Sequence, residues 1–290
     1  MAITDSALEL MAQGDTLEGQ KRLFSGEPAP DDRLTRINRC LYGMGHEDGH
    51  DLVEEEQERL LERLPQTRGA AQAVLLYDLG CIALYEDDIL DAKQRFAEVL
   101  KLEPGNRFAR HNLAYANELL AEYEQAKAQY SAVLEQDPGF VLSRMNLALL
   151  RMQLGEVERG LEELRALHQQ NPRNMGVLLY LCRSLLDSGT RDDAQAVLEL
   201  LERRRDWEEY LDLRECHAFA LYVLDKRAEA EAAFRGLVEA NGSNLFAHLG
   251  LIKVLASRGN FQELGAQLER YQALHPPESV QAILDDVRAL

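Results

Sequence analysis

The sequence predicts an all-α fold, a solenoid of stacked helix–turn–helix units with a capping C-terminal helix. Three observations predict it. Pro104, Pro138 and Pro172 stand 34 residues apart, and small and large apolar residues precede each of them in the same order. The helix formers Ala, Leu, Glu, Gln and Arg dominate the composition. Because a lone helical hairpin cannot bury its apolar face, this period indicates hairpins that stack on one another.

The first three units are predicted at 73–106, 107–140 and 141–174. Each places a pair beginning with Leu, a second small residue and a large residue at fixed distances before its proline. The small residues let the two helices of a unit approach closely, and the large residue fills the space between units. The residues concerned are Leu79-Gly80, Ala92 and Phe96; Leu113-Ala114, Ala126 and Tyr130; and Leu147-Ala148, Gly160 and Leu164.

Three further units are predicted at 175–208, 211–244 and 245–278. Leu181-Cys182, Ala194 and Leu198 hold the frame in the fourth unit, which lacks the proline. Pro276 then follows Pro172 by three periods plus two residues. We therefore expect a two-residue insertion near Arg205–Tyr210, between the fourth and fifth units.

The two ends of the chain are less regular. Residues 1–67 predict a degenerate helical region that caps the array, with helices at 4–13, 16–25, 31–43 and 52–64. Terminal repeats need an altered, more polar outer face, which suits this region. Residues 279–290 predict an amphipathic capping helix with Ser279 as its N-cap.

The motif Leu76-x2-Leu79-Gly80, followed by Ala92-x3-Phe96 and Pro104, resembles the tetratricopeptide repeat family. The resemblance covers roughly residues 73–278. It implies a right-handed superhelical solenoid in which the first helix of each unit lines a concave groove, and a protein partner lies along that groove. Two departures are visible: Arg110 and Arg144 replace a large aromatic residue early in the first helix, and His217 replaces the usual leucine.

Placing the sequence in the family's register assigns the side chains that line the groove. They are Tyr77, Tyr85, Phe108, His111, Asn112, Tyr115, Met145, Asn146, Leu149, Met152, Tyr180, Arg183, Phe219 and Tyr222. We expect the central members Tyr115, Met145, Leu149 and Met152 to be accessible, although residues of helical period also form cores. Aromatic and methionine side chains suit an apolar peptide or an amphipathic helix.

The two asparagines of this set have two interpretations. The amides of Asn112 and Asn146 either hydrogen-bond a ligand's backbone or serve the repeat itself. No Lys or Arg accompanies them on the wall of the first three units. A basic clamp for the C-terminal carboxylate of a chaperone, which the family also uses, is therefore disfavoured.

The charge of the chain bears on its partners. A net charge of −18, from 50 acidic and 32 basic residues, disfavours nucleic acid and anionic membranes. It favours basic partners or serves solubility. No apolar run is long enough for a membrane span and Met1–Gly14 lacks a signal-like leader, so no secretion is expected. The scattered cysteines Cys40, Cys81, Cys182 and Cys216 indicate a reducing compartment, the cytoplasm.

One stretch has residues suited to chemistry. Gly45–Asp51 holds two histidines and three carboxylates, which are competent metal ligands. Their order matches no standard metal motif, and a polar turn between helices is the simpler interpretation. No nucleophile elbow, phosphate loop or metalloprotease motif occurs elsewhere. We therefore expect no enzyme activity, no cofactor and no metal.

Two functions remain open at this stage. The first is a cytoplasmic adaptor or chaperone-like protein that holds an apolar segment of a partner in its concave groove. The second is an assembly scaffold that self-associates, or binds through its ends or convex face. In that case its own N-terminal region or a second copy of the chain would fill the groove.

Overall fold

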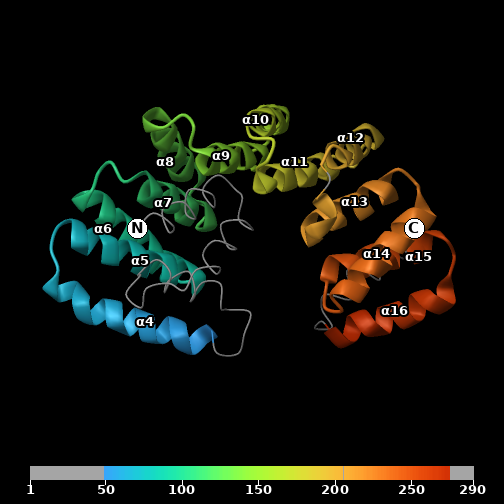
Figure 1. The fold of residues 1–290 in the computed structure, drawn as a ribbon, viewed down its shortest axis with the longest axis horizontal. Coiled ribbons are helices and arrows are strands. Elements are labelled where there is room, and N and C mark those ends of the chain that lie inside the picture. Colours follow the sequence, from blue (N-terminus) through green and yellow to red (C-terminus); the bar gives the residue numbers. More distant parts are fainter. Residues whose placement is uncertain (1–48, 205, 275–290) are drawn as a thin grey trace. The chain divides into compact units, whose positions relative to one another are not determined.

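The computed structural model describes residues 49–204 and 206–274, and every regular element in these ranges is a helix (Figure 1). The all-α class predicted from the period is confirmed. The chain divides into two compact units, Met1–Val177 and Leu178–Leu290, and each is described by itself.

The first unit is built of helix pairs that follow one another along the chain. Helix α5 packs on α6, α7 on α8 and α9 on α10, while α6 also contacts α7 and α8 contacts α9. The elements are α4 (Gly49–Arg63), η1 (Leu64–Gln66), α5 (Ala70–Tyr85), α6 (Ile89–Leu102), α7 (Arg107–Leu119), α8 (Tyr123–Gln136), α9 (Val141–Gln153) and α10 (Val157–Gln170).

Helix α11 (Met175–Asp187) spans the division between the units, and the second unit continues the pairing. Its further elements are α12 (Arg191–Glu202), η2 (Trp207–Glu209), α13 (Leu211–Val223), α14 (Arg227–Ala240), α15 (Leu245–Ser257) and α16 (Phe261–Leu274). Helix η2 lies where the two-residue insertion was expected.

The turn within a helix pair depends on one residue in the left-handed region. Asp87, Ala121, Gly155, Asp225 and Gly259 have φ between 58° and 92°. The next amide donates to a carbonyl five residues back, as in the bond from the amide of Glu122 to the carbonyl of Asn117, at 2.8 Å. This pattern ends the first helix and reverses the chain.

Asparagine side chains begin several of the first helices. The carboxamide oxygens of Asn106, Asn174 and Asn244 accept the amide three residues further on, at 3.0 Å in each case. An N-cap of this kind satisfies one of the amides that the first turn leaves without a partner.

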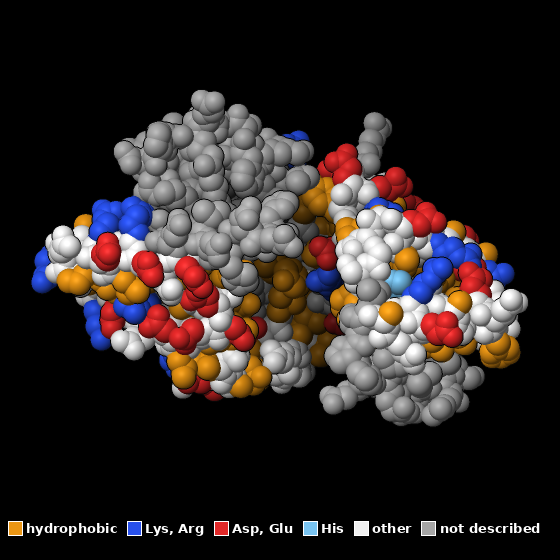
Figure 2. All heavy atoms as spheres, turned by 90° about the horizontal axis from the view of Figure 1, so that it is seen from below, with side chains coloured by type: hydrophobic (Ala, Val, Ile, Leu, Met, Phe, Trp, Pro, Cys, Tyr) orange, Lys and Arg blue, Asp and Glu red, His pale blue; other side chains and the backbone are white. Residues whose placement is uncertain are grey.

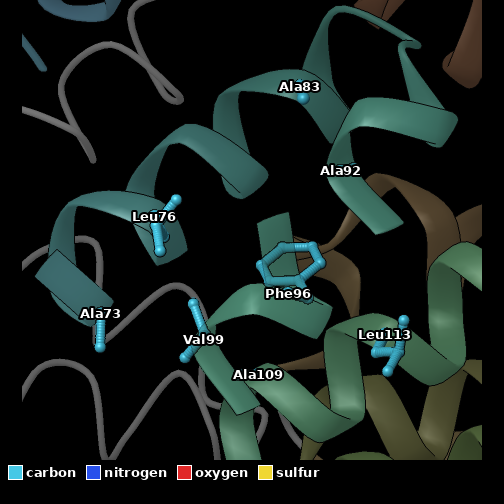
Figure 3. Close-up of a cluster of buried hydrophobic side chains, with 8 residues drawn as sticks. All are labelled: Ala73, Leu76, Ala83, Ala92, Phe96, Val99, Ala109 and Leu113. Atoms are coloured by element: carbon cyan, nitrogen blue, oxygen red, sulfur yellow. The ribbon is translucent and has the colours of Figure 1, made fainter. Parts of the chain in front are cut away.

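The core of each pair is one large side chain between small ones. In Figure 3 the Phe96 ring of α6 lies beside α5 and α7, among Leu76, Val99 and Leu113. Phe96, Tyr130, Leu164 and Phe234 hold equivalent places and are fully buried. A Cβ atom on Gly80 would stand 2.8 Å from the Phe96 ring, so the predicted need for a small residue is met here.

Side chains also join one pair to the next. Within the second unit, Arg191 of α12 donates to the carbonyl of Leu224 at 3.0 Å, just past α13. Arg227 of α14 donates to the carbonyl of Ser257 at 2.6 Å, at the end of α15. Each bond satisfies a carbonyl that the end of a helix leaves without a partner.

Some predictions lie outside the described residues. These are the helices at 4–13, 16–25, 31–43 and 279–290, and most of the loop Gly45–Asp51. Helix α4 is present where a helix was expected at 52–64. Within the described ranges, no helix is long and apolar enough to cross a bilayer.

Candidate protein-interaction surface

Helix α7 carries an exposed apolar stripe. The side chains of Phe108, Tyr115 and Leu119 are 41%, 40% and 47% exposed. They stand seven and four residues apart, a spacing that places them on one face of a helix. We call these three residues the α7 stripe. Phe108 and Tyr115 were predicted from the sequence, whereas Leu119 was missed, although its place four residues after Tyr115 puts it on the same face.

Other rings and a cation hold the Phe108 end of the stripe. The Phe108 ring meets Phe140 edge to face, with centroids 5.4 Å apart. The guanidinium of Arg107 lies 5.2 Å from the Phe108 centroid and 5.6 Å from that of Phe140. Arg107 also pairs with Asp137 at 2.9 Å. These contacts orient an exposed ring before any partner arrives, which lowers the ordering cost of binding.

Both predicted asparagines bond within the protein. The Asn112 amide nitrogen donates to the Tyr77 hydroxyl at 3.1 Å. That of Asn146 donates to the Tyr130 hydroxyl at 3.1 Å, and Tyr130 donates to Glu118 at 2.9 Å. Burial raises the pKa of both tyrosines well above the ordinary value. Both amides therefore bond within the repeat, as one of the two interpretations has it, and contact with a ligand stays a prediction.

His111 lies in the core between α7 and α9. It is 9% exposed, and its Nδ1 atom is 3.0 Å from the hydroxyl of Ser143. The rings of Tyr130 and Phe140 lie 5.5 Å and 5.6 Å away. Burial lowers the pKa of His111 to about 4, so the imidazole is neutral at pH 7. The sequence placed His111 on the groove wall, but here it joins two helices.

The central wall is also less open than expected. Met145 is 7% exposed and belongs to the core rather than to accessible surface. Leu149 and Met152 are half-buried. Met152 lies against α10, where a Cβ atom on Gly160 would come within 2.2 Å of its Cγ atom. Of the four central residues expected to be accessible, Tyr115 is the exposed one.

The remaining predicted residues are mostly half-buried or paired. Tyr85 is half-buried and packs on the cluster that joins α4 to α5. In the second unit, Tyr180 is 36% exposed and Tyr222 is half-buried. Arg183 pairs with Asp212 at 2.6 Å. The half-buried Phe219 ring meets Phe234 edge to face, with centroids 5.1 Å apart.

Charges are distributed rather than gathered into one field. On the face shown in Figure 2, acidic and basic side chains are interspersed over each unit. Many of them pair across helices, as Lys127 does with Glu156 at 3.4 Å. Over the described ranges, no three His, Cys, Asp or Glu side chains gather as a metal site would require.

Comparisons with known proteins match both the repeat pattern and the fold. Two tetratricopeptide repeat models match the sequence, one at residues 77–139 and 120–174, the other at 151–215. A comparison with curated protein sequences finds no match.

Among solved structures, a tetratricopeptide repeat protein of Parabacteroides merdae is 16% identical with a TM-score of 0.64, covering 87% of this chain and 99% of that one. A chain of the APC/C hetero-tetramer Cut9-Hcn1 is 17% identical with a TM-score of 0.67, over 98% and 55% of the two chains. Yeast Tom70 is 14% identical with a TM-score of 0.60, over 92% and 65%. The family models, together with the helix pairs and their 34-residue period, identify residues 77–215 as tetratricopeptide repeats, and the three solved structures share the fold.

Proposed function

We propose that the protein is a non-enzymatic adaptor or chaperone-like module that holds an apolar peptide or amphipathic helix of a protein partner. The α7 stripe is the observation that carries this proposal. Three large apolar side chains share one helix face, and each keeps 40% or more of its surface exposed. Covering them would remove apolar area from water, which is the main source of affinity in protein association.

The charge of the chain supports a partner with basic residues around its apolar anchors. The net charge is −18, and opposite charge on a partner raises the rate of encounter. Two of the described cysteines, Cys182 and Cys216, are buried free thiols. They favour a reducing compartment, and we take the cytoplasm as the place of action.

The experiment replaces exposed residues of the stripe only. Met145 is avoided because a charge at a buried site would unfold the protein. The variant Tyr115→Glu/Leu119→Glu is compared with Leu90→Glu/Leu102→Glu, which adds the same charge at two exposed leucines of α6. Proteins captured from native lysate by each variant are compared by mass spectrometry, with circular dichroism as the check on folding.

A partner retained by the Leu90/Leu102 variant and lost from the stripe variant is the expected result. A photo-crosslinking residue at position 115 should then join that partner directly. A set of partners that does not change between the two folded variants would rule out the stripe as the binding site.

A self-associating scaffold is the alternative function, and the second unit favours it. Phe246 and Phe261, on the last two described helices, are 54% and 74% exposed. If a second copy of the chain covers them, Phe246→Glu/Phe261→Glu will lower the mass measured by light scattering, and the stripe variant will not.

A further inference from the structure

The second unit contains a cavity in the hairpin α13–α14. Its volume is about 440 Å³, within the range of roughly 300–1,000 Å³ typical of ligand sites. Helix η2, the element at the predicted insertion, forms one wall. The lining residues are Trp207, Glu208, Arg214, His217, Ala232, Ala233 and Gly236.

Two other hairpins show how the same place is normally filled. In α7–α8, Arg110 donates to the carbonyl of Pro104 at 2.8 Å and to the side-chain oxygen of Gln129 at 3.0 Å. The partners lie six residues before and 19 residues after the arginine. In α15–α16, His248 contacts the carbonyl of Gly242 at 2.8 Å and the side chain of Gln267, at the same two spacings.

The hairpin α13–α14 keeps the cation and lacks both partners. Arg214 stands in the register of Arg110, but Ala233 replaces the glutamine, and no bond joins Arg214 to the carbonyl of Glu208. The Arg214 guanidinium instead donates to the carbonyl of Gly236, at 3.2 Å. A guanidinium has five N–H donors, so several remain for a ligand.

Two half-buried rings, Trp207 and His217, form the aromatic wall of the cavity. The rings of Trp207 and His217 lie with centroids 4.6 Å apart and planes inclined by 37°. Burial lowers the pKa of His217, which keeps its imidazole neutral near pH 7. Arg214 is therefore the positive charge of the lining, and the Glu208 carboxylate, which is exposed, forms no ion pair with it in the described residues.

We propose that this cavity binds a carboxylate carried on a flat apolar group. The carboxylate would accept from Arg214 in the place that the Gln129 oxygen holds beside Arg110. The apolar group would lie against Trp207 and above Ala232, Ala233 and Gly236. Paired N–H donors of a guanidinium match the two oxygens of a carboxylate.

The cavity is separate from the predicted groove. Residues 214 and 217 lie about 140° and about 160° around α13 from Phe219, given the helical rotation of about 100° per residue. A ligand in the cavity would therefore lie on the side of this helix away from Phe219, and the two sites can be tested independently.

Trp207 is the one tryptophan of the sequence, so its fluorescence reports on the cavity alone. The probes are N-acetyl-phenylalanine, which carries the carboxylate, and N-acetyl-phenylalaninamide, which does not. We expect the acid to change Trp207 emission in a saturable way and the amide to bind about tenfold more weakly or not at all.

Two variants remove the site by different routes. Arg214→Gln takes away the charge, and Ala233→Gln places in the cavity the side chain that fills it in α7–α8. Each should weaken binding of the acid about tenfold or more. The controls Arg203→Gln and Ala228→Gln make the same replacements at exposed positions of the second unit and should bind as the natural protein does.

Equal binding of acid and amide would overturn the proposal, as would an emission that neither probe changes. Unchanged binding by a folded Ala233→Gln variant would also overturn it. A second pair of probes, acetyl-Phe-Glu-amide and acetyl-Phe-Gln-amide, identifies the source of the carboxylate. Tighter binding of the Glu peptide than of N-acetyl-phenylalanine indicates an acidic side chain of a partner, and the reverse indicates a terminal or small-molecule carboxylate.

Discussion

The hairpins α7–α8 and α13–α14 share one register but differ in the side chains that stand at equivalent positions. In both, a large ring of the second helix, Tyr130 or Phe234, is fully buried between helices. In the first hairpin polar side chains bond one another, from Arg110 to Gln129 and from Tyr130 to Glu118. In the second, alanine stands in place of the glutamine and a cavity opens beside Arg214.

The difference teaches where function resides in an array of repeats. Positions that both hairpins share hold the helices together, as the buried rings do. Positions at which they differ leave surface open, as the exposed stripe of α7 and the lined cavity of α13–α14 show. Function in such a fold belongs to the departures from the repeat rather than to the repeat.

The largest effect on stability is expected at the buried rings that both hairpins share. Tyr130→Ala and Phe234→Ala should each lower the free energy of unfolding by about 3–5 kcal/mol, because each empties a fully buried site. Urea denaturation followed by circular dichroism measures the loss. Phe261→Ala, at a ring that is 74% exposed, is the control and should change stability by less than about 0.5 kcal/mol. A small effect at one buried ring and a large one at the other would mean that the hairpins do not share a core.

A second prediction concerns pH and the histidine of α7. The pKa of His111 is about 4 in the folded state against 6.5 for an ordinary histidine, so the unfolded state takes up the proton first as pH falls. The contribution of the neutral ring to the free energy of unfolding is fully present above pH 6.5. It falls by about 3 kcal/mol between pH 6.5 and pH 4. Denaturation midpoints at pH 7 and pH 4 measure this loss.

His111→Gln is the matched variant for that titration, because it removes the ionisable ring from the same site. The difference between the natural protein and the variant should shrink toward pH 4. Buried carboxylates such as Glu118, whose pKa burial raises, act in the opposite sense in both proteins and cancel in this difference. A difference that stays constant from pH 7 to pH 4 would contradict the buried, neutral histidine.

The smallest effect is expected from exchanging the residues at the position where the two hairpins differ, Gln129 and Ala233. Gln129→Ala should cost about 1 kcal/mol, since Arg110 loses a half-buried acceptor. Ala233→Gln should raise stability by up to about 1 kcal/mol if the new amide reaches Arg214. Thermal unfolding of the two single variants and the double variant measures both changes in stability. If both exchanges lower stability equally, the glutamine is not what fills the equivalent space.

Sequence reasoning reached the fold because the period repeats the same packing requirement. The small residue at Gly80 and the ring at Phe96 are set by each other, and such pairs recur every 34 residues. The insertion near Arg205–Tyr210 was found by counting alone. Its structure, helix η2 with Trp207 over His217, could not be found that way, because a loop outside the repeat has no register.

The groove was predicted less well, for a related reason. Register gives the direction of a side chain around its own helix but not the distance to the neighbouring helix. His111 of α7 meets Ser143 of α9, and both His111 and Met145 are buried. Tyr115 and Leu119 keep 40% and 47% of their surface exposed, a difference from Met145 and His111 that register alone does not give.

The arginines that join one helix pair to the next have a mechanical consequence. Arg191 and Arg227 each hold the end of a helix in the following pair, so every pair in this part of the chain depends on its neighbour. When the chain is pulled from its C-terminal end, these pairs should unfold in succession, each one after the neighbouring pair has unfolded. Each release frees one repeat, which lengthens the extended chain by roughly 110–120 Å. Under load the length of the chain would therefore increase in near-equal steps, one for each repeat, rather than in a single unfolding event.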